Sequence, residues 1–339
     1  MNRPLIACLL AWSPIGTCPA APLGDPALPA YIPEPAAAGV LVCTRAESME
    51  PLLREWMRQF RLRQPEIVLR QLTDTRFPTE AFPHLLDGKA EILTCPRELF
   101  PAEVAAFRAR HGYDPLLIAV ATGSRATVGG THAIAIHVNA ANPLDRLTMA
   151  QLREILTAGG RITTWGQLGL SGEWAAAPIR LQGMLQQRET GNPPGIVNFL
   201  EQQILRPGRL RDSIHQHLDQ PGRPSLEGIV MAVAGDRFAL GYSGFSQAVA
   251  GTKSLALAES DAGPFLAGSG EEIANRTYPL SRTVYLCVNR PPGGAFAPGV
   301  REFLTFILSR EGQQIVAADL TGFLPLTASM VAGDRTKLR

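Results

Sequence analysis

The chain has 339 residues, of which 45% are hydrophobic and 18% are charged. This composition is typical of a folded globular protein and excludes a disordered or fibrous chain. The 32 Lys and Arg residues nearly balance the 30 Asp and Glu residues, and aromatic residues make up only 6%. We therefore expect no nucleic acid partner, because such binding relies on a basic surface with interleaved aromatic side chains.

Residues 1–20 are typical of a secretory signal peptide. Arg3 precedes a short apolar run, and small residues follow up to Ala20. The apolar run is too short to span a bilayer. Residues 21–38 are rich in Ala and Pro and predict a disordered or extended leader. The sequence thus predicts a periplasmic or secreted protein; residues 15–18 also resemble a lipobox, so lipid anchoring at Cys18 is the alternative.

After the leader, short apolar runs alternate with amphipathic segments. Strands are predicted at residues 39–43, 67–69, 90–94, 116–121, 133–138, 179–181, 239–242, 255–257 and 283–288. Helices are predicted at residues 49–60, 81–86, 101–111, 149–157, 195–205, 298–309 and 311–318, with Thr148 as the cap of the fourth. Residues 228–234 fit either element. The repeated order of strand, loop and helix indicates an α/β fold with parallel strands.

Cleavage near Ala20 would leave Cys43, Cys95 and Cys287, which are far apart and lack the spacing of metal ligands. We interpret them as small buried residues, with one disulfide as the alternative in an oxidising compartment. The His215-x-His217 pair stands in a polar stretch and is interpreted as solvated surface. The sequence predicts no metal, no cofactor and no catalytic residues.

Three stretches carry a family resemblance: residues 142–169, with LTMAQLREIL and TWGQLG; residues 278–285, YPLSRTVY; and residues 303–326, with LSREGQQIV and GFLPL. In this order and spacing they resemble the substrate-binding proteins of phosphate ABC transporters, which have the type-II periplasmic binding fold. The resemblance covers about residues 40–327.

The resemblance implies two α/β lobes, each a mixed or parallel sheet flanked by helices, joined by two crossover segments near residues 131–139 and 278–289. Residues 39–130 and 278–339 would form lobe one, and residues 131–277 lobe two. It also implies an exported, monomeric solute-binding protein that is not an enzyme. Such a protein captures phosphate or a related oxyanion in the cleft and delivers it to a membrane permease.

A phosphate site without metal uses backbone N–H groups, hydroxyl donors and arginines. The family's first loop falls on Arg45, Ser48 and Met49, where Arg45 adds charge, Ser48 a hydroxyl and Met49 an N–H. Glu47 departs from the family pattern, because a carboxylate pointing inward would repel an anion. The alternative for Ser48 is that it only caps the following helix.

The second loop retains Thr79, and the third retains Arg97, for which a structural ion pair is the alternative. The first crossover contributes Thr131 and His132. His132 stands where the family has Asp, and its charge would change with pH. The alternative is a partly buried structural histidine.

The fourth loop retains Arg188 and Thr190, but Pro193 and Pro194 replace the family's Ser-Gly-Thr. Two prolines remove two N–H donors where the anion should lie. A second hypothesis follows: the scaffold is recruited as a sensor, adhesin or secretion accessory with weak or no phosphate binding. A secreted hydrolase would need a catalytic motif that we do not find.

Overall fold

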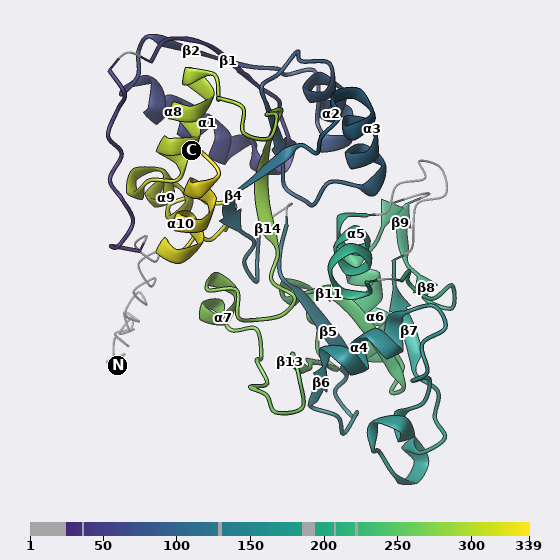
Figure 1. Cartoon of the computed structure of the whole chain (residues 1–339). Coiled ribbons are helices and arrows are strands. Elements are labelled where there is room, and N and C mark those ends of the chain that lie inside the picture. Colours follow the sequence, from purple (N-terminus) through teal and green to yellow (C-terminus); the bar gives the residue numbers. More distant parts are fainter. Residues whose placement is uncertain (1–24, 36, 128–130, 185–193, 207, 221–222) are drawn as a thin grey trace, which may run out of the picture.

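The computed structural model describes residues 25–339, apart from residues 36, 128–130, 185–193, 207 and 221–222. It contains two five-stranded sheets, each flanked by helices (Figure 1). The α/β class predicted from the sequence is therefore confirmed.

The first sheet joins strands from both ends of the chain. Its order is β2 (Ile67–Gln71), β1 (Gly39–Cys43), β3 (Ile92–Cys95), β14 (Thr283–Val288) and β4 (Leu116–Thr122). β1 runs parallel to β2 and β3, whereas β14 runs antiparallel to β3 and β4. A strand from the C-terminal part of the chain is thus inserted between two strands from the N-terminal part.

Helices from both ends of the chain pack around this sheet and form the first unit with it. They are α1 (Glu50–Arg61), α2 (Pro78–Leu86), α3 (Pro101–His111), α8 (Pro298–Ile307), α9 (Arg310–Ala317) and α10 (Ala328–Thr336). The apolar residues of α1 recur at helical spacing and face the core. Phe60 of α1 is fully buried edge-on to Phe303 of α8, with 5.2 Å between the ring centroids.

The second sheet has the order β12 (Thr252–Ser254), β5 (Ile134–Asn139), β11 (Ala239–Gly244), β7 (Arg180–Gly183) and β8 (His215–Gln216). It forms the second unit with α4 (Met149–Leu156), α5 (Gly195–Phe199), α6 (Leu226–Gly235) and α7 (Gly270–Ala274), and with the strand pairs β13 (Ala256–Ala258)–β6 (Arg146–Thr148) and β10 (Arg223–Pro224)–β9 (Leu218–Gln220). Short helical turns are η1 (Glu47–Met49), η2 (Trp165–Leu168), η3 (Gly172–Trp174), η4 (Leu200–Ile204) and η5 (Phe245–Gln247). The apolar core of the second unit, which includes Trp165 and Tyr242, is separate from that of the first unit.

The chain passes from the first unit to the second before β5 and returns before β14, and Figure 1 shows these two strands at the centre of the molecule. The two connecting segments are hydrogen-bonded to each other. The Ile134 N–H donates to the Leu280 carbonyl at 3.1 Å, and the Tyr278 hydroxyl donates to the Ile134 carbonyl at 2.9 Å. The YPLSR stretch of the sequence therefore lies where the two units meet.

The Ala- and Pro-rich leader packs against the first unit over its described residues. Leu28 is 1% exposed, and Tyr31 is also buried. The Tyr31 hydroxyl donates to the buried Glu302 carboxylate at 2.8 Å, and the Arg310 N–H donates to the Pro29 carbonyl at 2.8 Å. The leader's composition alone predicts a disordered or extended segment, but these few anchors tie it to α8 and α9.

Most predicted elements agree with the structure to within a few residues. Thr148 caps α4 as predicted, because its hydroxyl accepts the Gln151 N–H at 3.2 Å. The prediction missed α10, which buries only Val331 and Asp334 and therefore lacks a recognisable apolar stripe. Helix α5 ends at Phe199, and a π-helical turn follows it, so the helix expected over 195–205 is interrupted.

The three cysteines outside the predicted signal peptide are buried, and their thiols are free in the structure. Cys43 ends β1, Cys95 ends β3 and Cys287 lies within β14. Burial raises the pKa of the Cys43 thiol. These residues therefore pack as small apolar side chains, the first of the two interpretations made from the sequence.

Candidate functional site

The carboxyl ends of β1 and β3 lie side by side and bring the predicted loops together. The Thr94 N–H donates to the Thr44 hydroxyl at 3.0 Å, and the Thr94 hydroxyl donates to the Thr44 carbonyl at 2.9 Å. Because β2 is parallel to β1, the loop after β2 also leaves from this edge. Ligands of open α/β sheets bind beyond the carboxyl ends of strands, so this edge is the candidate site.

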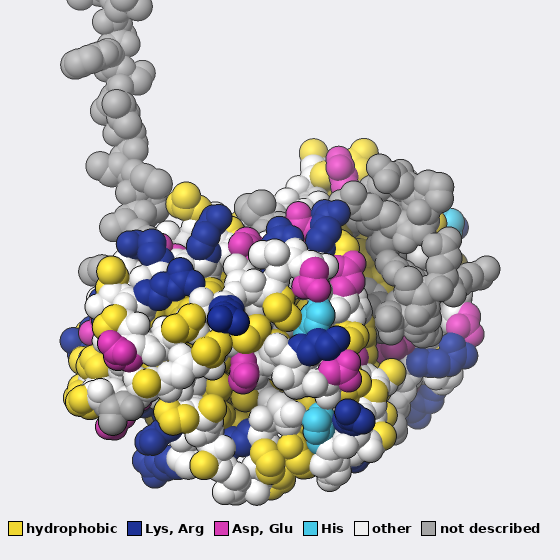
Figure 2. All heavy atoms as spheres, turned by 90° about the horizontal axis from the view of Figure 1, so that it is seen from above, with side chains coloured by type: hydrophobic (Ala, Val, Ile, Leu, Met, Phe, Trp, Pro, Cys, Tyr) yellow, Lys and Arg dark blue, Asp and Glu magenta, His cyan; other side chains and the backbone are white. Residues whose placement is uncertain are grey.

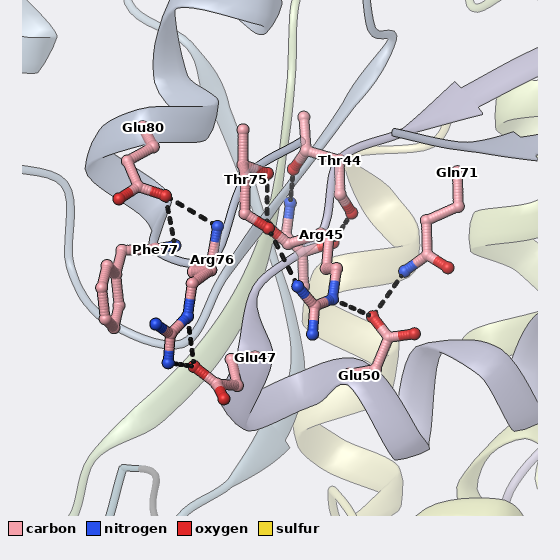
Figure 3. A network of polar contacts seen from close by, with 10 residues as sticks. Thr44, Arg45, Glu47, Glu50, Gln71, Thr75, Arg76, Phe77 and Glu80 are labelled. Atoms are coloured by element: carbon pink, nitrogen blue, oxygen red, sulfur yellow. Dashed lines mark hydrogen bonds and ion pairs between the residues drawn. The ribbon is translucent and has the colours of Figure 1, made fainter. Parts of the chain in front are cut away.

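The first loop is held in place by an ion pair (Figure 3). Arg45 Nε donates to Glu50 Oε2 at 3.2 Å, and its guanidinium also contacts the Thr75 carbonyl at 3.4 Å. The Met49 N–H donates to the Ala46 carbonyl at 2.9 Å within η1. Two of the three groups predicted for this loop are thus bonded within the chain.

Ser48 lies within η1 and is partly exposed. Helix α1 has Met49 as its N-cap residue, with no side-chain cap. The alternative that Ser48 caps α1 is therefore wrong, and its hydroxyl as an anion donor stays a prediction.

The second loop is joined to the first by further ionic contacts. Arg76 pairs with Glu47 at 3.0 Å, and these side chains are 63% and 49% exposed. Glu80 Oε2 accepts the Arg76 N–H at 2.7 Å, at the start of α2. Thr79, the predicted donor, is exposed in the first turn of α2. Figure 3 shows Glu47 turned toward Arg76, so the carboxylate that departs from the family pattern is neutralised at the surface.

Acidic and basic side chains are also interspersed on the face seen from above, where magenta groups lie among the dark blue ones (Figure 2). This pattern agrees with a formal net charge of +2 for the whole chain. Because charges of opposite sign lie close together on this face, they give it little long-range attraction for an anion.

Arg97 is buried and forms a two-point ion pair with Glu103. Its two outer nitrogens lie 2.8 and 2.7 Å from the Glu103 oxygens, and its guanidinium carbon lies 3.6 Å from the centroid of the Phe100 ring. Burial alone would lower the pKa of Arg97, but the hydrogen bonds and charge of Glu103 outweigh burial, so the pKa is raised. This geometry matches the ion-pair alternative; a role in anion binding stays a prediction.

The first crossover also reaches the loop after β3. The hydroxyl of the buried Thr131 donates to the Pro96 carbonyl. The His132 ring lies against Gly244 of β11, where an added Cβ would be 2.5 Å from its Cδ2 atom. His132 is therefore packed at the junction of the two units and is partly exposed.

Two charged residues that the sequence analysis did not select occupy the centre of this junction. Arg282, 5% exposed, donates to Glu98 Oε2 at 3.1 Å and to the Gly195 carbonyl at 3.2 Å. The Asn198 side chain donates to the Glu98 carbonyl at 3.1 Å. Arg282 was visible within the YPLSR stretch, whereas nothing in the sequence marks Glu98.

Arg188 and Thr190 lie outside the described residues. The fourth loop re-enters the structure at Pro194 and Gly195, and Gly195 begins α5. An added Cβ on Gly195 would lie 3.5 Å from Arg282 and 3.7 Å from Arg97, so the end of this loop contacts both buried arginines.

Within the described part of the chain, no group of three or more His, Cys, Asp or Glu side chains is placed to hold a metal ion. The His217 ring instead contacts Gln182 Oε1 at 2.9 Å. In the same part of the chain, no helix has the length and apolar character needed to cross a membrane.

Comparison with known proteins identifies the family of this chain. Residues 33–311 match the family model of the PBP superfamily domain. The phosphate-binding protein PstS of Pseudomonas aeruginosa is 30% identical over 336 residues, which cover 97% of this chain and 96% of the relative. The protein SphX of Synechococcus elongatus is 26% identical over 264 residues, covering 76% of this chain and 69% of the relative.

Two crystal structures share the fold at low sequence identity. An ABC-type phosphate transport receptor from Vibrio cholerae aligns with a TM-score of 0.51 and 17% identity, covering 84% of this chain and 99% of the receptor. PstS from Borrelia burgdorferi aligns with a TM-score of 0.51 and 16% identity, covering 85% of this chain and 99% of that protein. From the family match and the Pseudomonas relative together, the chain belongs to the PBP superfamily and, within it, to the family of the phosphate-binding protein PstS.

Proposed function

We propose that this chain is an exported solute-binding protein that captures phosphate or a related oxyanion between its two units. The observation that carries the proposal is the 30% identity to a phosphate-binding protein over nearly the full length of both chains. The site supports it, because loops after β1 and β3, the first crossover and the start of α5 converge on one junction.

Several finer points belong to this proposal. Residues 39–130 and 278–339 form lobe one, residues 131–277 form lobe two, and the hydrogen-bonded connections between them act as the hinge. The protein acts as a monomer in the periplasm or outside the cell, after removal of residues 1–20. It passes its ligand to the permease of an ABC transporter and catalyses no reaction.

The ligand contacts within this proposal come from Ser48, Thr79, Thr131, His132 and the fourth loop, with charge from arginine. The set is Arg45, Ser48, Met49, Thr79, Arg97, Thr131, His132, Arg188 and Thr190. Arg45 and Arg97 would have to share their charge with Glu50 and Glu103, the carboxylates that they already contact.

A second function is a scaffold with weak or no phosphate binding that serves as a sensor, adhesin or secretion accessory. The specific observation in its favour is that Arg45, Arg97 and Arg282 each pair with a carboxylate of the same chain. Such pairing leaves little uncompensated positive charge for a dianion.

Thermal unfolding of the mature chain in phosphate, sulfate, phosphonates and other oxyanions separates the two functions. The first predicts a rise in Tm of several degrees with one anion, saturating at micromolar concentration, because a ligand that binds only the folded state stabilises it. No shift with any anion would favour the second function.

Arg188→Ala identifies the contribution of the fourth loop. We expect the anion-dependent rise in Tm to disappear while the variant still folds. Arg206→Ala is the matched control, since Arg206 is an exposed arginine that contacts Gln203. An unchanged anion response of Arg188→Ala would remove Arg188 from the site.

A further inference from the structure

The loop at residues 96–99 is the point at which both connections and the second unit meet the first unit. Thr131 of the first crossover donates to the Pro96 carbonyl. Arg282 of the return segment contacts the Glu98 carboxylate at 3.1 Å, and Asn198 of α5 contacts the Glu98 carbonyl at 3.1 Å. Glu98 therefore bonds to the return segment through its side chain and to the second unit through its backbone carbonyl.

The Glu98–Arg282 pair is buried but incompletely bonded. The side chains are 10% and 6% exposed, and a single carboxylate oxygen makes the contact. The Nε atom of Arg282 is buried and has no hydrogen-bond partner within the described structure. Arg282 thus has a donor that is unused, and closed to solvent, while the pair with Glu98 is formed.

A polar cavity of about 350 Å³ lies directly beside this pair. Glu98 lines this cavity, together with Ser281 and two arginines, Arg153 and Arg276. The Ser281 hydroxyl is buried without a partner among the described residues. The cavity therefore provides space beside the Glu98 carboxylate, and two cationic residues, Arg153 and Arg276, line that space.

We propose that Glu98 is an internal competitor for the anion-binding junction: it occupies Arg282 when no ligand is bound and turns into the neighbouring cavity when an oxyanion takes its place. Glu98 then sets the affinity and selectivity threshold of the site, because an oxyanion must outcompete a carboxylate that is covalently tethered beside Arg282. This inference rests on the proposed anion-binding function and adds a residue to it.

The electrostatic consequence has a definite sign. A dianion that approaches Arg282 is repelled by the Glu98 carboxylate, and the repulsion is strong because both groups lie in a low-dielectric junction. Glu98→Gln removes the repulsion and keeps the size of the side chain. We expect this variant to bind inorganic phosphate at least about fivefold more tightly than the parent protein. A tenfold change in Kd corresponds to only ~1.4 kcal/mol, so the loss of a modest repulsion is enough for this gain.

The experiment is calorimetric titration of the full mature chain with inorganic phosphate. Glu259→Gln is the matched control, because Glu259 lines the same cavity but is exposed and makes no ion pair with Arg282. We expect Glu259→Gln to change the Kd less than about twofold, as befits a screened surface charge. Circular dichroism confirms that each variant is folded before titration.

A double-mutant cycle with Arg282→Gln tests whether Arg282 receives the anion. We expect the Glu98→Gln and Arg282→Gln double variant to lose the gain in affinity, although its net charge equals that of the parent. If Glu98→Gln fails to fold, Glu98→Ala, whose smaller side chain leaves space for water or an anion beside Arg282, replaces it in the comparison.

The outcomes separate the inference from the function on which it rests. Phosphate binding by the parent with no gain in Glu98→Gln overturns the inference and leaves the proposed function intact. Binding by Glu98→Gln but not by the parent supports the inference in its strongest form. Absence of binding in the parent and in every folded variant overturns both.

Discussion

The more exposed loops near Arg45 and Arg76 and the buried junction near Arg97 and Arg282 use the same chemistry in different surroundings. Both consist of arginine–carboxylate pairs at the carboxyl edge of the first sheet. The Arg76 and Glu47 side chains are 63% and 49% exposed, whereas the Arg97 and Glu103 side chains are 9% and 10% exposed. Pairs of the same residue types at similar distances therefore contribute differently to the stability of the protein.

Burial explains the difference. An exposed pair gains little, because water and salt screen the charges and two long side chains lose freedom. A buried pair depends on each partner, since removing one leaves an ionised group without water or counter-charge. The exposed pairs thus shape the loops, while the buried pairs fix the junction at which we place ligand capture.

The largest effect is expected for Glu103→Gln. The variant leaves the buried Arg97 guanidinium without its counter-charge. It also weakens the acceptor of the Phe100 N–H, whose nitrogen lies 2.7 Å from Glu103 Oε2 in the parent protein. We expect the free energy of unfolding to fall by about 3–5 kcal/mol, measured by urea denaturation. A loss below about 1 kcal/mol would contradict the distinction between the two regions.

The control replaces both partners of the pair. Arg97→Met combined with Glu103→Leu removes both charges while keeping apolar volume at the site. We expect more than half of the lost stability to return, because apolar replacement of a buried ion pair is often neutral or stabilising. If the double variant is as unstable as Glu103→Gln, packing rather than charge explains the loss.

The sequence was sufficient for the parts of the fold that local patterns encode. Helical spacing marked α1, the Thr148 cap marked α4, and the YPLSR stretch marked the return to the first sheet. The sequence also singled out Arg97 and gave two interpretations of it, an anion ligand and a structural ion pair. Glu103, whose carboxylate pairs with Arg97, lies in the first turn of α3, and nothing in the linear sequence shows that its side chain reaches back to Arg97.

Glu98 could not be predicted for a different physical reason. Its partner Arg282 is separated from it by most of the chain and approaches only because β14 inserts beside β3. Such a pairing depends on tertiary register, which composition and periodicity do not encode. The charge balance of the candidate site is therefore a property of the fold.

The effect of burial also predicts which histidine makes the stability of the fold sensitive to acid. His137 of β5 is fully buried, and burial lowers its pKa to about 4, although its contact with the Gly244 carbonyl opposes this shift. In the unfolded chain the pKa is about 6.5, so the unfolded state binds a proton that the folded state excludes. Stability is therefore lost as pH falls from about 6.5 to about 4, by up to ~3 kcal/mol.

Urea denaturation across this pH range, with His137→Gln as the reference, isolates the effect. We expect the stability difference between the two proteins to vary with pH inside the window and to be flat above it. His84→Gln is the control, because His84 contacts Asp74, a partner that is 64% exposed. A pH-independent difference for His137→Gln would place the acid sensitivity elsewhere.

The smallest effect is expected for the exposed pair, and it tests the comparison from the opposite side. Glu47→Gln removes the counter-charge of Arg76, but both side chains remain in contact with water. We expect a loss of less than about 1 kcal/mol in the free energy of unfolding, decreasing further in 0.5–1 M salt, roughly the range in which the screening length falls toward about 3 Å. The change also removes a negative charge from the edge of the candidate site, so phosphate affinity should rise slightly at low salt and not at high salt. A large, salt-independent loss of stability would mean that this loop is as tightly coupled to the fold as the buried junction, and exposure would no longer separate the two regions.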